Sequence, residues 1–211
     1  LEARLIFDTG QRKEGFLSLY LYHEGQMIYH FNFRFDYNVD GTPSVYIGTI
    51  QGSKHGLETT KVLTKKLFGY RPKNFILYLM RIFVQTLGIH DIYVITDEGF
   101  YTNSHMLRGN RSKKTNFNEF WIGEGAAPDG KEPWYYHLPI EERRRKYGEI
   151  KSQKRNLFRK RYLLMDTIIP PYIAAIKALF RQGFDPVPSA IDEASITDKP
   201  ADYDPIEAPA K

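Results

Sequence analysis

Hydrophobic and polar positions alternate through the first part of the chain and predict an antiparallel sheet. A short apolar run at residues 5–7 is followed by two longer alternating segments, residues 16–22 and 27–37. In the longer segment, large aromatic side chains occupy one face and mostly polar ones the other. Polar turns separate these segments from one another and from a further apolar run at residues 44–51. A period of two interrupted by turns is typical of strands joined as hairpins.

The next stretch predicts a strand, two helices and a second strand. Residues 57–68 carry apolar positions near one helical face, and the strongly apolar residues 75–87 are expected to be buried. A short buried strand follows at residues 92–95. Two strands joined by a long helical crossover form a parallel β-α-β unit, which is almost always right-handed. Ligands of such units bind at the carboxyl ends of the strands, here residues 51–56 and 96–100.

The C-terminal part predicts more strands and a long helical region. Strands are expected at residues 117–122 and 134–138, and a charged helix at 141–161. An apolar helix at 162–180 is expected to be interrupted at Pro170 and Pro171. The fold class is therefore α/β (α+β), a mixed and mainly antiparallel sheet with one parallel crossover and long C-terminal helices. One domain is expected over residues 1–183, followed by a tail rich in proline and acidic residues at 184–211.

Composition excludes several kinds of site. The 211 residues are 42% hydrophobic and 26% charged, which is ordinary for a globular domain. There is no cysteine, so disulfides, thiolate metal sites and cysteine nucleophiles are excluded. The six histidines are scattered without the spacing of metal ligands, and G-x-S-x-G is absent. We expect no metal, and no unbroken apolar run is long enough to predict a transmembrane segment.

The turn between the strand at residues 44–51 and the helix at residues 57–68 is a candidate phosphate site. Glycines allow close approach of a ligand to the backbone, a helix N-terminus attracts anions, and a lysine adds positive charge. The alternative is a strand-to-helix connection that simply requires glycine. The cofactor-binding candidates of this turn are Gln51, Gly52, Ser53, Lys54 and Gly56.

Four residues are candidates for acid–base catalysis. Asp97 and Tyr101 follow the central strand, where a carboxylate can act as a base and a tyrosine as a proton donor. His105 belongs to the same loop, and Glu119 is flanked by aromatics whose packing would raise its pKa. The alternatives are an ordinary polar turn for Asp97, a solvated histidine for His105, and a strand carboxylate paired with a basic residue for Glu119.

Positive charge is concentrated in one stretch. The net charge is +5, and residues 143–161 contain ten Lys or Arg against a single acid, Glu149. Such a face suits phosphate-bearing partners: nucleic acid, coenzyme A or the anionic surface of a membrane. A solvated helix face, or one neutralised by the acidic tail, is the alternative. The candidate anion-binding residues are Arg71, Lys151, Lys154, Arg155, Arg159 and Arg161.

Several segments together resemble the VirK/YbjX family of Gram-negative bacteria: GFLSLYLYHEGQMIYHFNFRF, IGTIQG, LTKKLFGYRPKNFILYLMR, FNEFW and LPIEERRRKYGEIKSQKRNLFRKRYLLMD. This resemblance covers about residues 15–179. It implies an association with virulence, envelope integrity and resistance to antimicrobial peptides, but no defined biochemical activity. It also implies further residues before the point at which this chain begins.

A weaker resemblance is to the GNAT acyltransferase fold, in which a turn of the form Q/R-x-x-G-x-G/A holds the pyrophosphate of coenzyme A. The turn here has the Gln and the Gly but departs from that spacing. The resemblance implies an acyltransferase that uses acyl-CoA and acts on an envelope component, in the cytoplasm or peripherally at the inner membrane. The alternatives are a non-enzymatic module that binds nucleic acid or anionic lipid through the basic helix, and an envelope-homeostasis scaffold.

Overall fold

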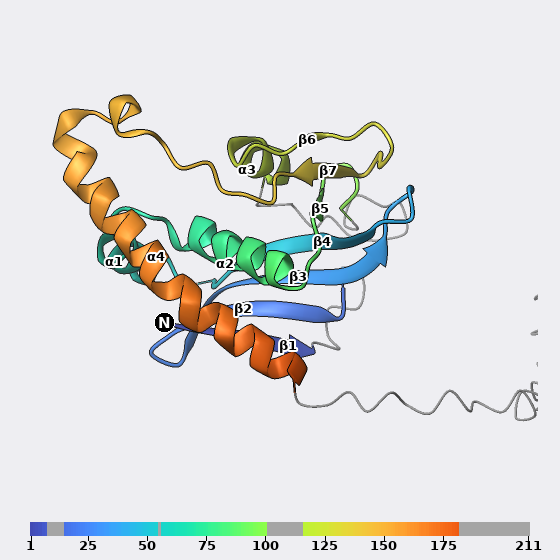
Figure 1. Cartoon of the computed structure of the whole chain (residues 1–211), viewed down its shortest axis with the longest axis horizontal. Coiled ribbons are helices and arrows are strands. Elements are labelled where there is room, and N and C mark those ends of the chain that lie inside the picture. The colour runs from blue at the N-terminus through green and yellow to red at the C-terminus, as the bar shows by residue number, and fades with distance from the viewer. Residues whose placement is uncertain (8–14, 55, 101–115, 182–211) are drawn as a thin grey trace, which may run out of the picture.

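A seven-stranded mixed sheet forms the centre of the molecule (Figure 1). The computed structural model describes residues 1–7, 15–54, 56–100 and 116–181. Strand order across the sheet is β1-β2-β3-β4-β5-β7-β6. The strands are β1 (Glu2–Phe7), β2 (Leu17–His23), β3 (Gln26–Tyr37), β4 (Pro43–Gly52), β5 (Asp91–Ile95), β6 (Ala127–Pro128) and β7 (Tyr135–Leu138). All neighbouring pairs are antiparallel except β4 and β5, which are parallel.

Helices cover one face of this sheet in two layers. Figure 1 shows α2 lying across the sheet and α4 crossing outside α2. The helices are α1 (Leu57–Lys66), α2 (Pro72–Thr86), α3 (Phe117–Gly123), the short 3-10 helix η3 (Tyr147–Glu149) and α4 (Ser152–Arg181). The predicted fold class, with one parallel crossover and a long C-terminal helix, is confirmed.

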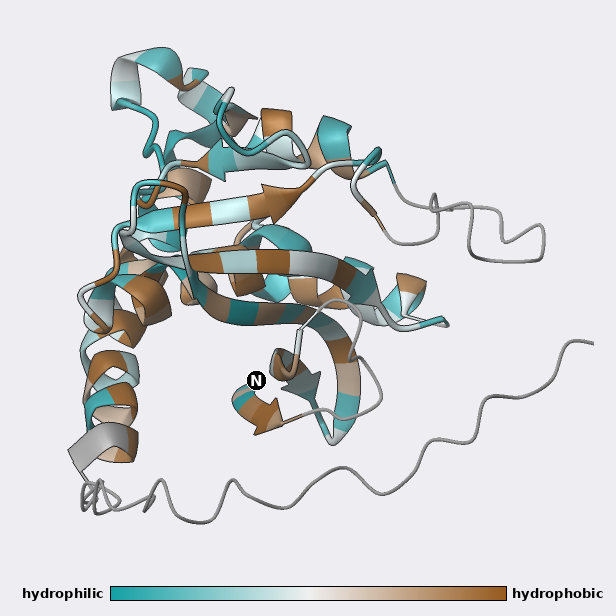
Figure 2. Cartoon of the chain, turned by 90° about the vertical axis from the view of Figure 1, so that its right-hand side faces the viewer, coloured by the Kyte–Doolittle hydropathy of each residue, from teal (hydrophilic) through white to brown (hydrophobic). Residues whose placement is uncertain are grey.

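The core lies between the sheet and α2. The alternating segments place Leu19, Leu21, Phe31 and Phe33 on the face that α2 covers, and all four are buried. Figure 2 shows the corresponding alternation of hydrophobic and hydrophilic residues along the strands. The phenyl ring of Phe33 meets that of Phe83 of α2 edge to face, with centroids 5.9 Å apart. The predicted burial of the second crossover helix is thus confirmed.

The parallel pair separates at its carboxyl end. β4 and β5 pair from Ser44 with Asp91 to Ile47 with Val94. Opposite this point the register between β3 and β4 shifts, because Phe33 pairs with Ile47 and Asn32 with Thr49. A bulge of this kind bends a strand and increases its local twist. Beyond Ile47, β4 therefore continues with β3 but no longer pairs with β5.

Three expectations for the C-terminal half are wrong. Residues 117–122 form a helix, α3, rather than a strand. The side chain of Asn116 accepts a hydrogen bond from the backbone N–H of Glu119, and Asp97 Oδ1 accepts one from that of Phe117. These two acceptors satisfy N–H groups that the first helical turn leaves free, so they favour a helix start here.

The other two wrong expectations concern the long C-terminal helix. Residues 141–151 are largely irregular, and α4 begins only at Ser152. It then runs unbroken through Pro170 and Pro171, which lie inside the helix. Both prolines are exposed, as are Asp166 and Thr167, four residues before each. Water can therefore bond to the carbonyl groups that the prolines leave unpaired, and the helix tolerates them.

Candidate functional site

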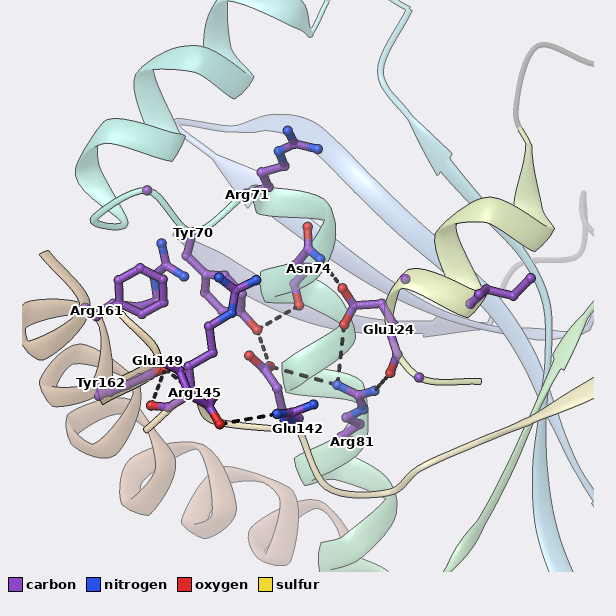
Figure 3. Close-up of a pocket in the computed structure, with 16 residues that line it drawn as sticks. Tyr70, Arg71, Asn74, Arg81, Glu124, Glu142, Arg145, Glu149, Arg161 and Tyr162 are labelled. Atoms are coloured by element: carbon purple, nitrogen blue, oxygen red, sulfur yellow. Dashed lines mark hydrogen bonds and ion pairs between the residues drawn. The ribbon is translucent and has the colours of Figure 1, made fainter. Parts of the chain in front are cut away.

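A cavity of about 690 Å³ lies where α2, α4, the end of α3 and the irregular segment before α4 meet (Figure 3). α2 contributes one wall through Asn74 and Arg81, and the turn before it contributes Tyr70 and Arg71. The site thus draws on chain segments that are far apart in the sequence. Other lining residues are Glu124 after α3, Glu142, Arg143, Arg145 and Glu149 before α4, and Phe158, Arg161 and Tyr162 of α4.

The floor of the cavity is built around a buried arginine. The side chain of Arg81 is only 2% exposed, and its guanidinium lies 3.6 Å from a carboxylate oxygen of Glu124 and 4.0 Å from one of Glu142. It also donates hydrogen bonds of 3.1 Å to the backbone oxygens of Pro139 and Glu124. A buried charge is tolerated only when it is paired and hydrogen-bonded, and Arg81 meets both conditions.

Two carboxylates share this single guanidinium. Glu142 also accepts a short hydrogen bond from the Tyr70 hydroxyl, and Glu124 accepts one from the side-chain amide of Asn74. Burial raises the pKa of Glu142, an effect that the Tyr70 hydrogen bond and the Arg81 charge oppose. Burial likewise raises the pKa of Tyr70, so the hydroxyl stays protonated and donates a hydrogen bond to Glu142. The floor thus holds a carboxylate whose raised pKa suits it to taking up a proton.

The rim of the cavity is basic. Arg161 donates two hydrogen bonds, of 3.2 and 3.1 Å, to the backbone oxygen of Phe68 and lies over the Phe158 ring at 4.3 Å. Burial lowers the pKa of Arg161. Within the part of the chain that the structure describes, the guanidinium groups of Arg71 and Arg145 form no hydrogen bond or ion pair. Their charges are therefore available to a ligand.

Overall, the cavity favours an anion. Five arginines and three glutamates line it, so its formal charge is +2. The first turn of α2 also borders it, because Arg71 is the N-cap residue and Pro72 occupies the first helical position. The free N–H groups of that turn add partial positive charge. Together these groups would suit a phosphate at the rim and a proton transfer at the floor.

The turn at residues 51–56, predicted to bind phosphate, lies at the other end of α1 from this cavity. Gly56 is the N-cap residue of α1, whereas Gly69, after its C-terminus, lines the cavity. A ten-residue helix is about 15 Å long, so the turn and the cavity cannot hold the same phosphate group. In the turn, the backbone N–H of Ser53 already bonds to Ile28, and that of Gly56 bonds to Ser53. Lys54 is exposed.

The structure describes two of the four catalytic candidates, Asp97 and Glu119. Asp97 caps α3, and its own backbone N–H donates to the Asn118 side chain at 2.8 Å. Glu119 is exposed on α3, so the expected burial between aromatics is wrong. Its position in the first helical turn is one that favours a carboxylate. Tyr101 and His105 lie outside the described residues.

The basic stretch divides between two environments. Lys151, Lys154, Arg155 and Arg159 are exposed at the start of α4. Arg161, predicted with them, instead lines the cavity together with Arg71 from the other side (Figure 3). The sequence thus brings these two arginines together only through the tertiary fold, because ninety residues separate them.

The floor residues were not predicted. The one usable signal was Arg81 itself, a charged residue within a helix whose neighbours are almost all apolar. Such a residue is rarely buried without partners, so it indicated acidic groups nearby. Nothing in the sequence indicated that those groups are Glu124 and Glu142. Among the described residues there is no cluster of three acidic or histidine side chains that could hold a metal ion.

Comparisons with known proteins place the chain in a family. The family model described as "Protein of unknown function (DUF535)" matches residues 1–171. The Escherichia coli protein YbjX is 29% identical over 133 residues, which are 62% of this chain and 40% of that protein. A Haemophilus influenzae protein is 27% identical over 171 residues, 79% of this chain and 54% of that protein. The chain spans about half the length of these curated relatives.

A solved structure, a mutant of the toxin AtaT bound to the C-terminus of the antitoxin AtaR, covers 79% of this chain and 72% of its own. It is 14% identical with a TM-score of 0.32, which is too low to establish a common fold.

Proposed function

The chain belongs to the DUF535 family, the VirK/YbjX proteins of unknown function. We propose that it is an acyltransferase-like enzyme acting on a component of the cell envelope. The observation that carries the proposal is the cavity, in which basic rim residues surround a buried carboxylate. The segments that resemble the family supply most of it: Tyr70 and Arg81 come from one segment, and Glu142 and Arg161 from another.

The rim would bind the phosphates of an acyl-CoA or a similar donor. Arg71 and Arg145 carry unpaired charges, and arginine is well suited to bind phosphate because its planar fork donates two parallel hydrogen bonds. The fold is consistent with this donor, because β4 and β5 are parallel and separate beyond Ile47. The resemblance to the GNAT acyltransferase fold supports this reaction class, but fold likeness alone does not establish an activity.

The floor would carry the proton transfers. Glu142 would take a proton from the hydroxyl or amine of the acceptor as the acceptor attacks the acyl carbon. The bond from acceptor to acyl carbon forms and the carbon–sulfur bond of the thioester breaks. Glu142 would then give that proton to the departing thiolate, while Tyr70 stays protonated and holds Glu142 in place through their hydrogen bond. Every proton is then accounted for, and no further reactant is needed.

The test uses the absence of cysteine from the chain. A thiol reagent then reports only the coenzyme A that is released from acyl-CoA in the presence of an envelope lipid extract. We expect release with the native protein, and at least about a hundredfold slower release with Glu142→Gln, the range that general acid–base catalysis contributes. Equal rates for Glu142→Gln and the native protein would contradict the role of this carboxylate. Absence of release with any acyl chain would contradict the acyltransferase.

A second function is supported by the four exposed cations at the start of α4. A non-enzymatic module would bind nucleic acid or anionic lipid through them, and its binding would weaken steeply with salt. An envelope scaffold would instead use the same face for a protein partner. Either would act in the cytoplasm or at the inner membrane, with the link to virulence and antimicrobial-peptide resistance that the family resemblance implies.

A further inference from the structure

The two sides of α4 differ in what they contact. Its inner side lines the cavity through Phe158 and Tyr162 and packs in the core through Met165 and Ile176, both buried. We define the outer face by exposed residues at three- and four-residue spacing on the opposite side of the helix. These residues are Arg159, Lys160, Leu163, Thr167, Pro170 and Ala174.

Positive charge on α4 is not neutralised by the rest of the described chain. α4 contains a single acidic residue, Asp166, and Arg144 from outside the helix pairs with it at 2.6 Å. The guanidinium of Arg159 donates only to the neutral side chain of Asn156. The exposed Lys160 forms no ion pair among the described residues. The first half of the outer face therefore keeps its full charge.

An exposed leucine lies among these cations. Leu163, one turn after Arg159, is 66% exposed. Beyond Leu163 the outer face continues with the uncharged Thr167, Pro170 and Ala174, and the exposed Lys177 follows one turn later. Figure 2 shows hydrophobic segments along α4 at the edge of the molecule. A face that combines Lys and Arg with exposed apolar side chains is the pattern of a helix that lies in a membrane interface.

We propose that the outer face of α4 binds the anionic surface of a phospholipid bilayer. The cations would meet lipid phosphates, and Leu163 would enter the boundary between headgroups and acyl chains. Nucleic acid would use the cations equally well but would leave Leu163 in water. The inner side of the same helix lines the cavity, so docking would hold the cavity about one helix diameter, or roughly 10 Å, from the lipid surface.

The helix lies on the membrane rather than across it. By length and composition, α4 is the one helix among the described residues that is apolar enough to cross a membrane. However, Met165 and Ile176 are buried against the rest of the protein, and Arg161 bonds to Phe68 at the end of α1. A spanning helix would have to break all of these contacts. The proposal is independent of the acyltransferase function, because it concerns only this outer surface.

Co-sedimentation with vesicles tests the proposal. The 211-residue chain is mixed with vesicles of phosphatidylcholine alone, or of phosphatidylcholine with 30% phosphatidylglycerol, in 0.1 M salt. Each basic residue near an anionic surface contributes about fivefold to binding. We expect binding to the anionic vesicles only, weakened about 25-fold by the double substitution Arg159→Gln/Lys160→Gln. Leu163→Ser should also weaken it severalfold.

Matched variants on α1 provide the controls. Lys65→Gln/Lys66→Gln removes the same charge from another exposed helix, and Val62→Ser removes a side chain that is 48% exposed there. Both should bind vesicles nearly as well as the native protein. Equal losses for the two double variants, no effect of Leu163→Ser, or no binding to anionic vesicles would each overturn the proposal. Tighter binding to single-stranded RNA than to anionic vesicles would overturn it in favour of nucleic acid.

Discussion

The buried guanidinium of Arg81 is expected to stabilise the whole cavity, and Arg81→Met tests this. The substitution preserves an unbranched side chain of comparable length but removes the charge and five N–H donors. It would leave Glu124 and Glu142, 15% and 18% exposed, without the cation that they share. It would also leave the backbone oxygens of Pro139 and Glu124 without their donors.

The expected magnitude follows from these contacts. Removing one partner of a buried ion pair costs about 3–5 kcal/mol, mostly because the remaining charges stay buried and unpaired. In a chain of this size, 1 kcal/mol changes the melting temperature by about 2–4 °C, so the loss should be about 6–20 °C. Urea denaturation measures the free energy of unfolding directly, and an unchanged m-value would show that the unfolded state is not altered.

Two comparisons make the result specific. Arg143 lines the same cavity, but its side chain is 85% exposed, so Arg143→Met should cost less than about 0.5 kcal/mol. In Arg81→Met/Glu124→Gln/Glu142→Gln, neutral amides replace the two carboxylates, so no unpaired charge stays buried. The triple variant should therefore be more stable than the summed losses of the three single variants predict. A cost below about 1 kcal/mol for Arg81→Met, or simple additivity in the triple variant, would refute this account of the cavity floor.

Three further predictions concern neighbouring groups. Burial raises the pKa of Glu142 above its ordinary 4.5. The stability of the native protein relative to Glu142→Gln should therefore fall as the pH rises above about 4.5 and through the raised pKa. A stability difference that does not change with pH would contradict this. Burial lowers the pKa of Lys73 from 10.5 to about 8. The stability of the native protein relative to Lys73→Met, measured by urea unfolding, should therefore increase between pH 8 and 10.5. A decrease over this range would be inconsistent with the lowered pKa. Asn116→Ala should cost about 1 kcal/mol through loss of the cap of α3, and unchanged thermal unfolding would argue against that cap.

The sequence predicted the strands and the parallel crossover well because their signals are local. Alternation along residues 27–37 placed Phe31 and Phe33 on the core face, and a glycine follows each predicted crossover helix, where left-handed residues are common. Gly69 and Gly88 indeed adopt the left-handed conformation, with φ of +74° and +73°. The apolar run at residues 117–122 was ambiguous because helices and strands of this length look alike by pattern. Asn116 was the local signal for a helix start there.

The candidate site was harder to predict because its members come from distant segments. Arg71 and Arg161 were both chosen for their charge, but only the packing of α4 near the start of α2 brings them to one cavity. Glu142 lies in a charged stretch predicted as helix, where it looked like an ordinary solvated acid beside Glu141. Its burial depends on Tyr70 and Arg81, and neither contact has a signature in the sequence around Glu142.

The most direct test of the central claim measures where an acyl-CoA binds. The melting temperature of the native chain is recorded with and without a long-chain acyl-CoA, then repeated for Arg71→Met/Arg145→Met at the cavity and Lys54→Gln/Gly56→Ala at the turn. The φ of Gly56, −80°, is one that alanine adopts, and the added Cβ would lie 3.2 Å from Cβ of Ser53, which must shift slightly to make room. A ligand at a hundred times its dissociation constant stabilises by about 2.7 kcal/mol, or about 5–11 °C here.

We predict that the native chain and the turn variant show this increase and that the cavity variant loses it. An increase lost only in the turn variant would assign the donor to residues 51–56 instead, and would contradict the cavity as the donor site. No increase in any of the three proteins would contradict acyl-CoA binding altogether.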